Sequence, residues 1–344
     1  MIQFPKGLEK SSSLMAKYLT PEIFNELKEK KTNNGFSLQD TIQSGIDNPD
    51  SGIGAYAGDA ESYEVFAPLF DKIIEEYHGY PKNGKHKSNL NPHHLDAPNP
   101  DADSKYIIST RIRVGRNIAD IPLGTAISKE QRNKVEQDVS NILNSFEGSL
   151  EGKYYPLNNM TQKESESLIS DHFLFKNGDR FLESAGLNRD WPHGRGIFHN
   201  NEKTFLVWIN EEDELRIISM QKGGDIKEVF TRLTLAISKI EEKITFAYNE
   251  HLGYITSCPT NLGTAMRASV HIKLPKLGKK IELFQKIADK YHVQIRGING
   301  EHSDSEGGIY DISNKRRLGV TEVECVQDMY NGVVALIKAE QELE

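Results

Sequence analysis

The first 80 residues carry the apolar spacing of helices. Between residues 59 and 78, apolar side chains recur every three or four positions: Val65, Phe66, Leu69, Phe70, Ile73, Ile74 and Tyr77. This stripe is typical of an amphipathic helix, and Gly79 follows it as a plausible C-cap. Thr20 and Pro21 predict another helix start, because proline is favoured at the first helical position after an N-cap. We therefore expect this region to be mostly helical.

Residues 81–105 interrupt the pattern. Pro81, Pro92, Pro98 and Pro100 lie there among Asn, Lys, His and Asp, with few apolar residues. Such a composition is typical of a linker. It divides the helical region from a longer second region.

From residue 106 onward, strand and helix patterns alternate. Ser128 with Gln131, and Thr161 with Glu164, have the spacing of capping boxes. Strands are predicted at 106–108, in a hairpin over 196–208 that turns at Asn200–Asn201, at 215–220 and at 265–274, and helices at 225–248, 277–291 and 322–340. Hairpins without regular βαβ units favour an α+β fold, in which helices pack on an antiparallel sheet.

Composition narrows the class of protein. The chain has 344 residues, 37% hydrophobic and 27% charged, which is ordinary for a globular protein of two domains. Its net charge of −8 argues against a general nucleic-acid or anionic-membrane binder. No apolar run approaches the ~18–20 residues of a membrane span. Two cysteines, Cys258 and Cys325, predict neither a disulfide scaffold nor a structural zinc site, so we expect a cytoplasmic protein.

Three motifs resemble ligand sites but lack the required context. Residues 79–85 approach a Walker A pattern, yet His86 stands where Ser or Thr must hold Mg²⁺. Residues 52–57 fit a dinucleotide fingerprint, but no strand precedes them. His86, His93 and His94 lie in the linker, where a solvated polar segment is a simpler interpretation than a metal site.

Five arginines stand at positions where strands are expected. Arg111 and Arg113 are two residues apart, so they share one face of a strand. Arg216, Arg267 and Arg296 lie in or after three further strand-like segments. Taken singly, each is explained as a surface arginine or a local salt bridge. Together they would bind a polyanion, because guanidinium groups match phosphate oxygens in pairs.

Carboxylates and a cysteine complete the candidate chemistry. Glu211, Glu212 and Asp213 follow Asn210 at a turn between strands, and Glu301 follows a glycine-containing loop. These carboxylates are either solvated, or two of them form a pair that binds a cation such as a guanidinium. Cys258 is either a small buried hydrophobic residue or, helped by the Thr260 hydroxyl and a nearby cation, a thiolate.

Several blocks together resemble a known family. Cys258-Pro259-Thr260-Asn261-Leu262-Gly263-Thr264 is the most specific. It is joined by Ser109-Thr110-Arg111-Ile112-Arg113, by residues 171–175 and by Arg296 through Arg317, which includes residues 307–314. From about Leu8 to Ala339, the chain resembles the phosphagen (guanidino) kinases, and among them most closely the arginine kinases. The resemblance implies a small all-α domain over residues 1–80, a linker over 81–105, and a larger domain over 106–344 with an antiparallel β-sheet flanked by helices.

The resemblance also implies roles for individual residues. The phosphate-binding positions would be Arg111, Arg113, Arg216, Arg267 and Arg296. The nucleoside would lie near Ser109, His172, His271 and Asp311, with the same blocks contributing Thr110, Ile112, Ala268, Ser269, Val270, Gly297, Ile298, Asn299 and Gly300. The guanidinium would be held by the catalytic residues Glu212, Cys258 and Glu301. The other end of that substrate would meet Ser51, Gly52, Ile53, Gly54 and Tyr56, and Asp50 with Arg180 would bridge the two domains.

The activity implied by the resemblance is reversible transfer of the ATP γ-phosphoryl group to the guanidino nitrogen of L-arginine, giving phosphoarginine and ADP for ATP buffering. Mg²⁺ would be held by nucleotide phosphates and water, without protein ligands. The short loop at residues 50–56 and the second carboxylate, Glu301, favour arginine over creatine. Asn299 departs from the arginine common in that loop, which puts one loop-closing salt bridge in doubt.

Other functions stay open at this stage. They are kinases for taurocyamine, lombricine or creatine, a protein arginine kinase, and a catalytically silent nucleotide-binding protein. The substrate loop counts against a protein substrate, and the retained arginines and glutamates count against a silent protein. The sequence leaves open whether the protein is a monomer or a homodimer.

Overall fold

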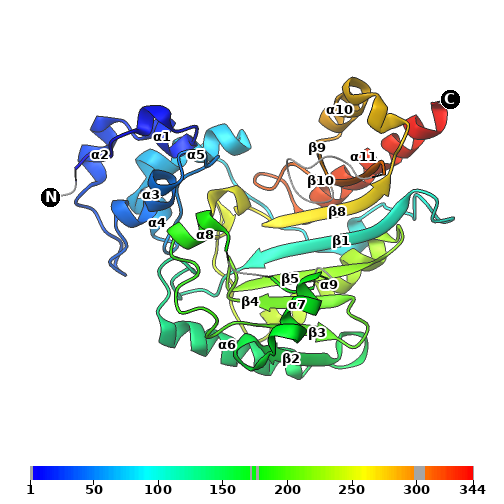
Figure 1. Cartoon of the computed structure of the whole chain (residues 1–344), viewed down its shortest axis with the longest axis horizontal. Coiled ribbons are helices and arrows are strands. Elements are labelled where there is room, and N and C mark those ends of the chain that lie inside the picture. The colour runs from blue at the N-terminus through cyan, green and yellow to red at the C-terminus, as the bar shows by residue number, and fades with distance from the viewer. Residues whose placement is uncertain (1–2, 171–172, 176–177, 298–306, 344) are drawn as a thin grey trace.

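The computed structural model describes residues 3–170, 173–175, 178–297 and 307–343. The chain forms a group of N-terminal helices beside a larger part that is built on one sheet (Figure 1). The N-terminal helices are α1 (Leu14–Tyr18), α2 (Pro21–Leu27), α3 (Leu38–Asp47), α4 (Ser62–Val65) and α5 (Ala67–His78). The predicted helical region is confirmed.

The local signals explain where these helices begin and end. The Thr20 hydroxyl accepts a hydrogen bond from the backbone of Ile23, which caps α2, and Gly79 ends α5 with φ 63°. The single helix predicted over residues 59–78 is wrong in one respect, because it is interrupted at Phe66. Pro68 follows at the start of α5, and proline can neither donate a helical hydrogen bond nor fit beside the preceding turn.

Residues 79–106 connect the two parts. They contain one short 3₁₀ helix, η2 (Pro92–His94), and no other regular element, as expected of the predicted linker. The linker is nevertheless attached to the larger part, because Ser88 and the backbone of Asn89 donate hydrogen bonds to Glu322. The domain boundaries at residues 80 and 106 stay predictions.

The larger part contains one sheet of eight strands within the described residues, in the order β2-β3-β4-β5-β1-β8-β10-β9. Every neighbouring pair in it is antiparallel, which confirms the α+β prediction. The strands are β1 (Ile107–Arg116), β2 (Gly152–Pro156), β3 (Gly196–Asn200), β4 (Phe205–Ile209), β5 (Leu215–Lys222), β8 (Met266–Lys273), β9 (Val293–Gly297) and β10 (Ile309–Asn314). A separate two-stranded ribbon pairs β6 (Tyr248–Asn249) with β7 (Gly253–Tyr254).

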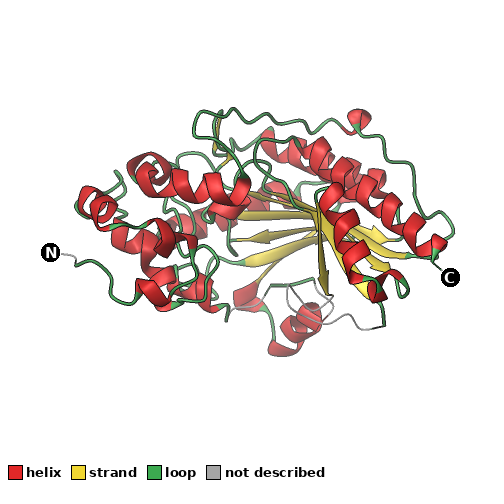
Figure 2. Ribbon diagram, turned by 90° about the horizontal axis from the view of Figure 1, so that it is seen from above, coloured by secondary structure: helices red, strands yellow, loops and turns green. Residues whose placement is uncertain are grey.

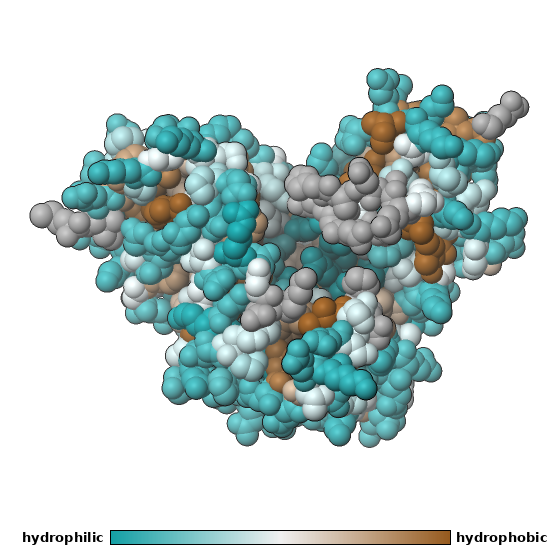
Figure 3. Space-filling view, viewed as in Figure 1, coloured by the Kyte–Doolittle hydropathy of each residue, from teal (hydrophilic) through white to brown (hydrophobic). Residues whose placement is uncertain are grey.

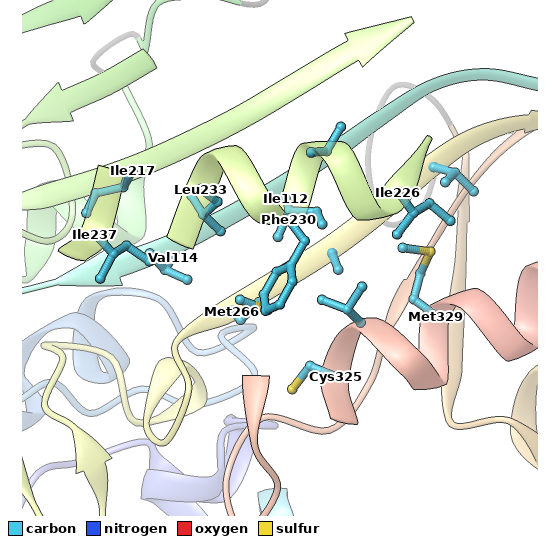
Figure 4. Close-up of a cluster of buried hydrophobic side chains, with 14 of the residues drawn as sticks. Ile112, Val114, Ile217, Ile226, Phe230, Leu233, Ile237, Met266, Cys325 and Met329 are labelled. Carbon is cyan, nitrogen blue, oxygen red and sulfur yellow. The ribbon is translucent and has the colours of Figure 1, made fainter. Parts of the chain in front are cut away.

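Long helices cover one face of the sheet (Figure 2). They are α6 (Lys129–Asn144), α9 (Ile226–Glu241), α10 (Ile281–Lys290) and α11 (Glu322–Glu342). Phe230, Ile237 and Met329 from these helices gather with Ile112 and Met266 of the sheet in the main core (Figure 4). The opposite face carries a smaller apolar cluster beneath α7 (Gln162–Ser170).

The helix predicted over residues 225–248 is shorter than expected. It ends at Glu241, although Ile244 and Phe246 continue the apolar spacing. Phe246 instead forms a bridge with Ile118, and the backbone of Ala247 donates to the carbonyl of Asn117. Pairing with a distant segment therefore overrides the local periodicity.

The core of the N-terminal helices is shared with the larger part. Their apolar cluster includes Leu252, Ile255, Leu262 and Leu318 from the larger part. Leu262 belongs to the Cys258 block and Ile255 lies three residues before it, so the N-terminal helices pack directly against that block. Among the described helices, none combines the length and apolarity needed to cross a bilayer.

Candidate active site

The predicted phosphate-binding arginines extend from the uncovered face of the sheet. Arg113 on β1 is directly opposite Arg267 on β8, and Gly115 of β1 is opposite Arg216 on β5. One small cavity is lined by Arg113, Arg216 and Arg267, joined by Arg317. Side chains separated by up to 204 positions in the sequence therefore meet at one place, as the polyanion hypothesis requires.

The charge of this cluster is only partly balanced by the carboxylates of the described residues, because Arg216 pairs with Glu211 and Glu212 and Arg267 pairs with Asp311. Neither Arg111 nor Arg113 forms an ion pair with a carboxylate of the described part of the chain. Burial, together with the charges of Arg216 and Arg267, lowers the pKa of Arg111 to about 10 and places the pKa of Arg113 well below its usual value. Since arginine stays protonated in proteins, these shifts indicate buried positive charge that an anionic ligand would stabilise.

Trp208 lies near two of the arginines. The guanidinium carbons of Arg111 and Arg216 each lie 5.5 Å from the centre of its ring, a distance suited to cation–π attraction. Its indole nitrogen donates to the carbonyl of Phe173 at 2.7 Å, which fixes the ring.

The predicted nucleoside residues form a second row across the same face. Ser109 of β1 is opposite His271 of β8, which is opposite Asp311 of β10, and Asp311 is opposite Arg296 of β9. His271 lies four residues along β8 from Arg267, about 13 Å at strand rise. A nucleotide that extends along β8 would meet the first row with its phosphates and the second with its nucleoside.

Asp311 connects the two rows. It accepts a hydrogen bond from Arg267 at 2.9 Å, and the Nε2 atom of His271 lies 3.4 Å from its other oxygen. Burial acts to raise the pKa of Asp311, but these two neighbours outweigh it and hold the pKa below its usual value. The carboxylate therefore stays charged and fixes the direction of the Arg267 side chain.

Four predicted nucleotide-binding residues face away from the site. Ile112, Ala268 and Val270 are fully buried in the main core, and the Thr110 hydroxyl donates to the carbonyl of Gly223. Because side chains alternate along a strand, they lie on the helix-covered face, opposite to Arg111 and Arg267. Only the side-chain position is shown here, on the face opposite to Ser269, so that a part for these residues in nucleotide binding stays a prediction.

Glu212 lies in the turn between β4 and β5, which is braced from several sides. The backbone of Asn210 donates to the carbonyl of Glu214 at 2.8 Å, and its side chain donates to the carbonyls of Arg132 and Gly194. Asp213 accepts from Asn117 at 2.9 Å. The acidic turn is therefore a fixed part of the structure and not a solvated loop.

The Glu212 carboxylate is held between two donors. Arg216 donates to Oε2 at 2.8 Å and Asn261 donates to Oε1 at 3.2 Å. Burial raises the pKa of Glu212 to about 7; Arg216 opposes this rise, while Asp213 and Glu211 add to it. A carboxylate with a pKa near neutrality can accept a proton during a reaction.

Cys258 is buried beside Tyr56, Ala185 and Leu187. Its sulfur lies 3.1 Å from the Thr260 hydroxyl. Burial and the charge of Glu212 raise the pKa of the Cys258 thiol to about 12, although the Thr260 hydrogen bond opposes the rise. Without a substrate cation, the protonated thiol is therefore the stable form, which does not support the expectation of a resident thiolate.

The predicted substrate loop lies next to the Cys258 block. The backbone of Ala57 donates to the carbonyl of Ser257 at 2.8 Å, which places Tyr56 against Cys258. Ser51 and Ile53 are mostly buried, and the carbonyls of Gly52 and Ile53 accept hydrogen bonds from the start of α1. Gly54 has φ 76°, and a Cβ there would lie 2.9 Å from Ser13, so glycine is required at this position.

Asp50 and Arg180 form the predicted ion pair between the two parts. Arg180 begins the short helix α8 (Arg180–Ser184) and donates to both oxygens of Asp50. Ser44 and Asn48 of the N-terminal helices also donate to this helix. Figure 3 shows the molecular surface hollowed between the N-terminal part and the larger part.

Some predicted residues cannot be assessed. His172, Ile298, Asn299, Gly300 and Glu301 lie outside the described residues. Gly297 ends β9 opposite Tyr310. The second carboxylate of the guanidinium site is therefore a prediction from the sequence alone.

Sequence reasoning missed three members of the site, Trp208, Asn261 and Arg317. Arg317 lines the arginine cavity and donates to Asn261 at 2.7 Å. Asn261 belongs to the Cys258 block, and Arg317 directly follows Arg316 after the last strand. The adjacent arginines were a signal, but only the fold shows that Arg316 pairs with Asp328 whereas Arg317 faces the site.

The family follows from comparison with known sequences. Residues 9–75 match the N-terminal domain of the ATP:guanido phosphotransferases, and residues 134–343 match their C-terminal catalytic domain. The chain belongs to the ATP:guanido phosphotransferase family, which confirms the resemblance seen in the motifs.

Individual relatives are similar over nearly the whole chain. It is 55% identical to the arginine kinase of Anthopleura japonica over 98% of this chain and 48% of that protein, so it spans about half of that relative. It is 54% identical to arginine kinase Lit v 2 of Penaeus vannamei over 96% of this chain and 93% of that protein.

Solved structures agree with the fold. A lombricine kinase superposes with a TM-score of 0.93 at 40% identity, covering 98% of this chain and 94% of that chain. The duplicated taurocyamine kinase from Schistosoma mansoni gives 0.92 at 42% identity, covering 99% of this chain and 49% of that one.

Proposed function

We propose that this protein is an arginine kinase, which transfers the γ-phosphoryl group of MgATP reversibly to a guanidino nitrogen of L-arginine. The observation that supports it most is the contact between Arg216 and Glu212. Arg216 belongs to the arginine cavity, and Glu212 is the carboxylate beside the Cys258 block. This contact supports the proposal because a triphosphate held by the arginines would then lie next to a cationic acceptor held by Glu212.

The arginines supply most of the proposed catalysis. Phosphoryl transfer requires positioning and charge stabilisation more than covalent chemistry from the protein. Arg113, Arg216 and Arg267 would neutralise oxygens of the transferring group as its charge redistributes. Arg111, fixed against Trp208, would bind the adjacent phosphate.

Glu212 is the proposed base. A guanidinium has a pKa above ~12, so its proton must leave while the N–P bond forms. In that step the guanidino nitrogen attacks the γ-phosphorus, the bond to the β–γ bridging oxygen breaks with its electrons leaving on ADP, and the proton passes to Glu212. Cys258 would favour the acceptor by ionising when the cationic guanidinium binds beside it, and Glu301 would hold the acceptor from another side.

Mg²⁺ would be held through nucleotide phosphates and water. Within the described residues, no three His, Cys, Asp or Glu side chains lie close enough to form a metal site, and the surplus of arginines suits a ligand that brings its own metal. The ion would supply further neutralisation of the phosphate oxygens.

The choice of L-arginine rests on two supports. The relatives at 54–55% identity bear the name arginine kinase, whereas the lombricine and taurocyamine kinases reach 40–42%. The short, glycine-containing loop against Cys258 also leaves space for an acceptor with an amino-acid end. We further propose the cytoplasm as its location, since both cysteines are free and buried.

A panel of acceptors tests this proposal. Purified protein with MgATP is given L-arginine, taurocyamine, lombricine or creatine, or a casein-like protein, and ADP release is followed. We expect the highest kcat/KM with L-arginine. A higher value with another guanidine would reassign the substrate, and no turnover with any of them would contradict the proposed activity.

A further inference from the structure

We propose that Asn261 is a positioning residue for phosphoryl transfer, because it orients the Glu212 carboxylate toward the acceptor while Arg317 fixes the direction of the Asn261 amide. The inference rests on the proposed function of Glu212 and adds a residue to it. It is carried by three side chains that lie in contact at the edge of the arginine cavity.

Asn261 donates a hydrogen bond to one oxygen of the Glu212 carboxylate and so fixes its orientation. It is the last residue of the 3₁₀ turn η5 (Pro259–Asn261), and its Nδ2 atom lies 3.2 Å from Oε1. Oε2 accepts from Arg216 at 2.8 Å. Among the described residues, one donor is found for each oxygen, and the remaining lone pairs have a defined direction in which to meet a guanidinium.

Arg317 makes the amide of Asn261 point one way. Its Nη1 atom donates to Oδ1 of Asn261 at 2.7 Å and to the carbonyl of Thr260 at 3.0 Å. Arginine has only donors, so the oxygen of the amide must face Arg317 and the NH₂ group must face Glu212. A flipped amide would set oxygen against carboxylate and NH₂ against guanidinium.

The turn that carries Asn261 is also fixed from the N-terminal helices. His78, at the end of α5, has Nε2 2.8 Å from the carbonyl of Pro259. Burial lowers the pKa of His78 to about 4, so the neutral ring donates this bond. The backbone of Asn261 donates to the carbonyl of Cys258 at 3.0 Å, and one rigid turn thus sets both Cys258 and Asn261 relative to the acceptor.

Arg317 also connects Asn261 to the arginine cavity. Arg317 lines the same cavity as Arg113, Arg216 and Arg267. Two successive hydrogen bonds, Arg317 to Asn261 and Asn261 to Glu212, therefore connect the proposed phosphate site to the proposed base.

The test is Asn261→Asp, which keeps the shape but replaces the NH₂ donor with a carboxylate oxygen. We expect kcat/KM for L-arginine to fall by about 10- to 100-fold, the effect of losing a hydrogen bond to a charged group. The KM for ATP should stay within about twofold. The acidic limb of the pH profile of kcat/KM should move upward by about one unit, because a second negative charge stabilises protonated Glu212.

Two further variants make the result specific. Asn261→Leu removes the donor without adding charge, and we expect a loss of about tenfold or more; it replaces Asn261→Asp if that variant does not fold by circular dichroism. Asn249→Asp is the matched control, since Asn249 is also partly buried but lies at the end of β6, where its side-chain oxygen accepts from the backbone of His251 and Leu252. Its kcat/KM and pH profile should be those of the wild type.

Failure of this inference is distinguishable from failure of the proposed function. If wild type phosphorylates arginine and Glu212→Gln is inactive, yet Asn261→Asp keeps kcat/KM within twofold and an unshifted pH profile, the positioning role is wrong. A fall in kcat/KM with no shift in the acidic limb also contradicts it, since that outcome indicates only a structural role. If wild type phosphorylates no guanidine, the proposed function fails first.

Discussion

The two faces of β1 and β8 show how one pair of strands provides both fold and site. On the helix-covered face, Ile112, Val114, Met266 and Ala268 are fully buried in the main core. On the opposite face, the alternate positions hold arginines and His271. Since alternation places successive side chains on opposite faces, packing of the first set fixes the position of the second.

The two faces differ most in whether their buried arginines have a carboxylate partner. On the covered side of the larger part, buried Arg116 lies against Glu322 and over the ring of Tyr254. On the site face, Arg111 and Arg113 have no such partner within the described residues. The comparison teaches that an unbalanced buried charge marks the ligand site, whereas a balanced one marks the framework.

The largest effect is expected from Glu212→Gln on the site side. The amide keeps the shape of the side chain but cannot accept the proton. We expect kcat to fall by about 10²- to 10⁴-fold, while the dissociation constant for ADP, measured by calorimetry, changes little. Unchanged kcat would remove Glu212 from the role of base, and equal loss of ADP binding would mean that the carboxylate only supports the nucleotide site.

A substitution on the covered face should lower the free energy of unfolding and leave kcat unchanged. Ile112→Ala leaves a cavity in the core, and we expect it to lower the free energy of unfolding by about 2–5 kcal/mol in urea titrations. The kcat of the folded protein should stay near that of the wild type. Arg111→Met, one residue earlier, is the matched variant, with activity lost and unfolding little changed. Similar kcat losses for both would contradict the division between the faces.

Protonation of a buried histidine away from the site face should lower the free energy of unfolding. His86 is buried, and its Nδ1 atom accepts from the backbone of Gly319. Burial, assisted by the charge of Arg116, lowers the pKa of His86 to about 4. Because the unfolded chain takes up the proton near pH 6.5, this contribution to stability is complete above pH 6.5 and declines as pH falls toward 4, by up to about 1.4 kcal/mol per unit.

His86→Asn isolates that effect, since Oδ1 can accept the same hydrogen bond but does not titrate. Unfolding free energies measured between pH 7 and 5 should fall less steeply in the variant than in the wild type. Equal slopes would assign the pH dependence to other groups.

Local patterns predicted most of the framework. The cap at Thr20, the capping box at Ser128 and the alternation through β8 are all found in the structure. The errors arose where distant contacts decide, as at Phe246, which leaves its predicted helix to bridge Ile118. For the site, the motifs indicated the arginines and Glu212, but a resemblance of blocks does not separate the two faces of a strand, so it did not show that the side chains of Ile112 and Val270 point into the core. Arg317 and Asn261 were missed because only the tertiary fold brings them to Glu212.

The central claim is that arginines from separate strands form one polyphosphate site. Calorimetric titration with inorganic tripolyphosphate tests it most directly, in wild type, Arg267→Met and Arg232→Met, the last being an arginine of α9 paired with Glu228. We expect one bound tripolyphosphate per chain, about 10- to 100-fold weaker binding for Arg267→Met, and no change for Arg232→Met. Equal affinity in wild type and Arg267→Met, or no binding to the wild type, would contradict the account.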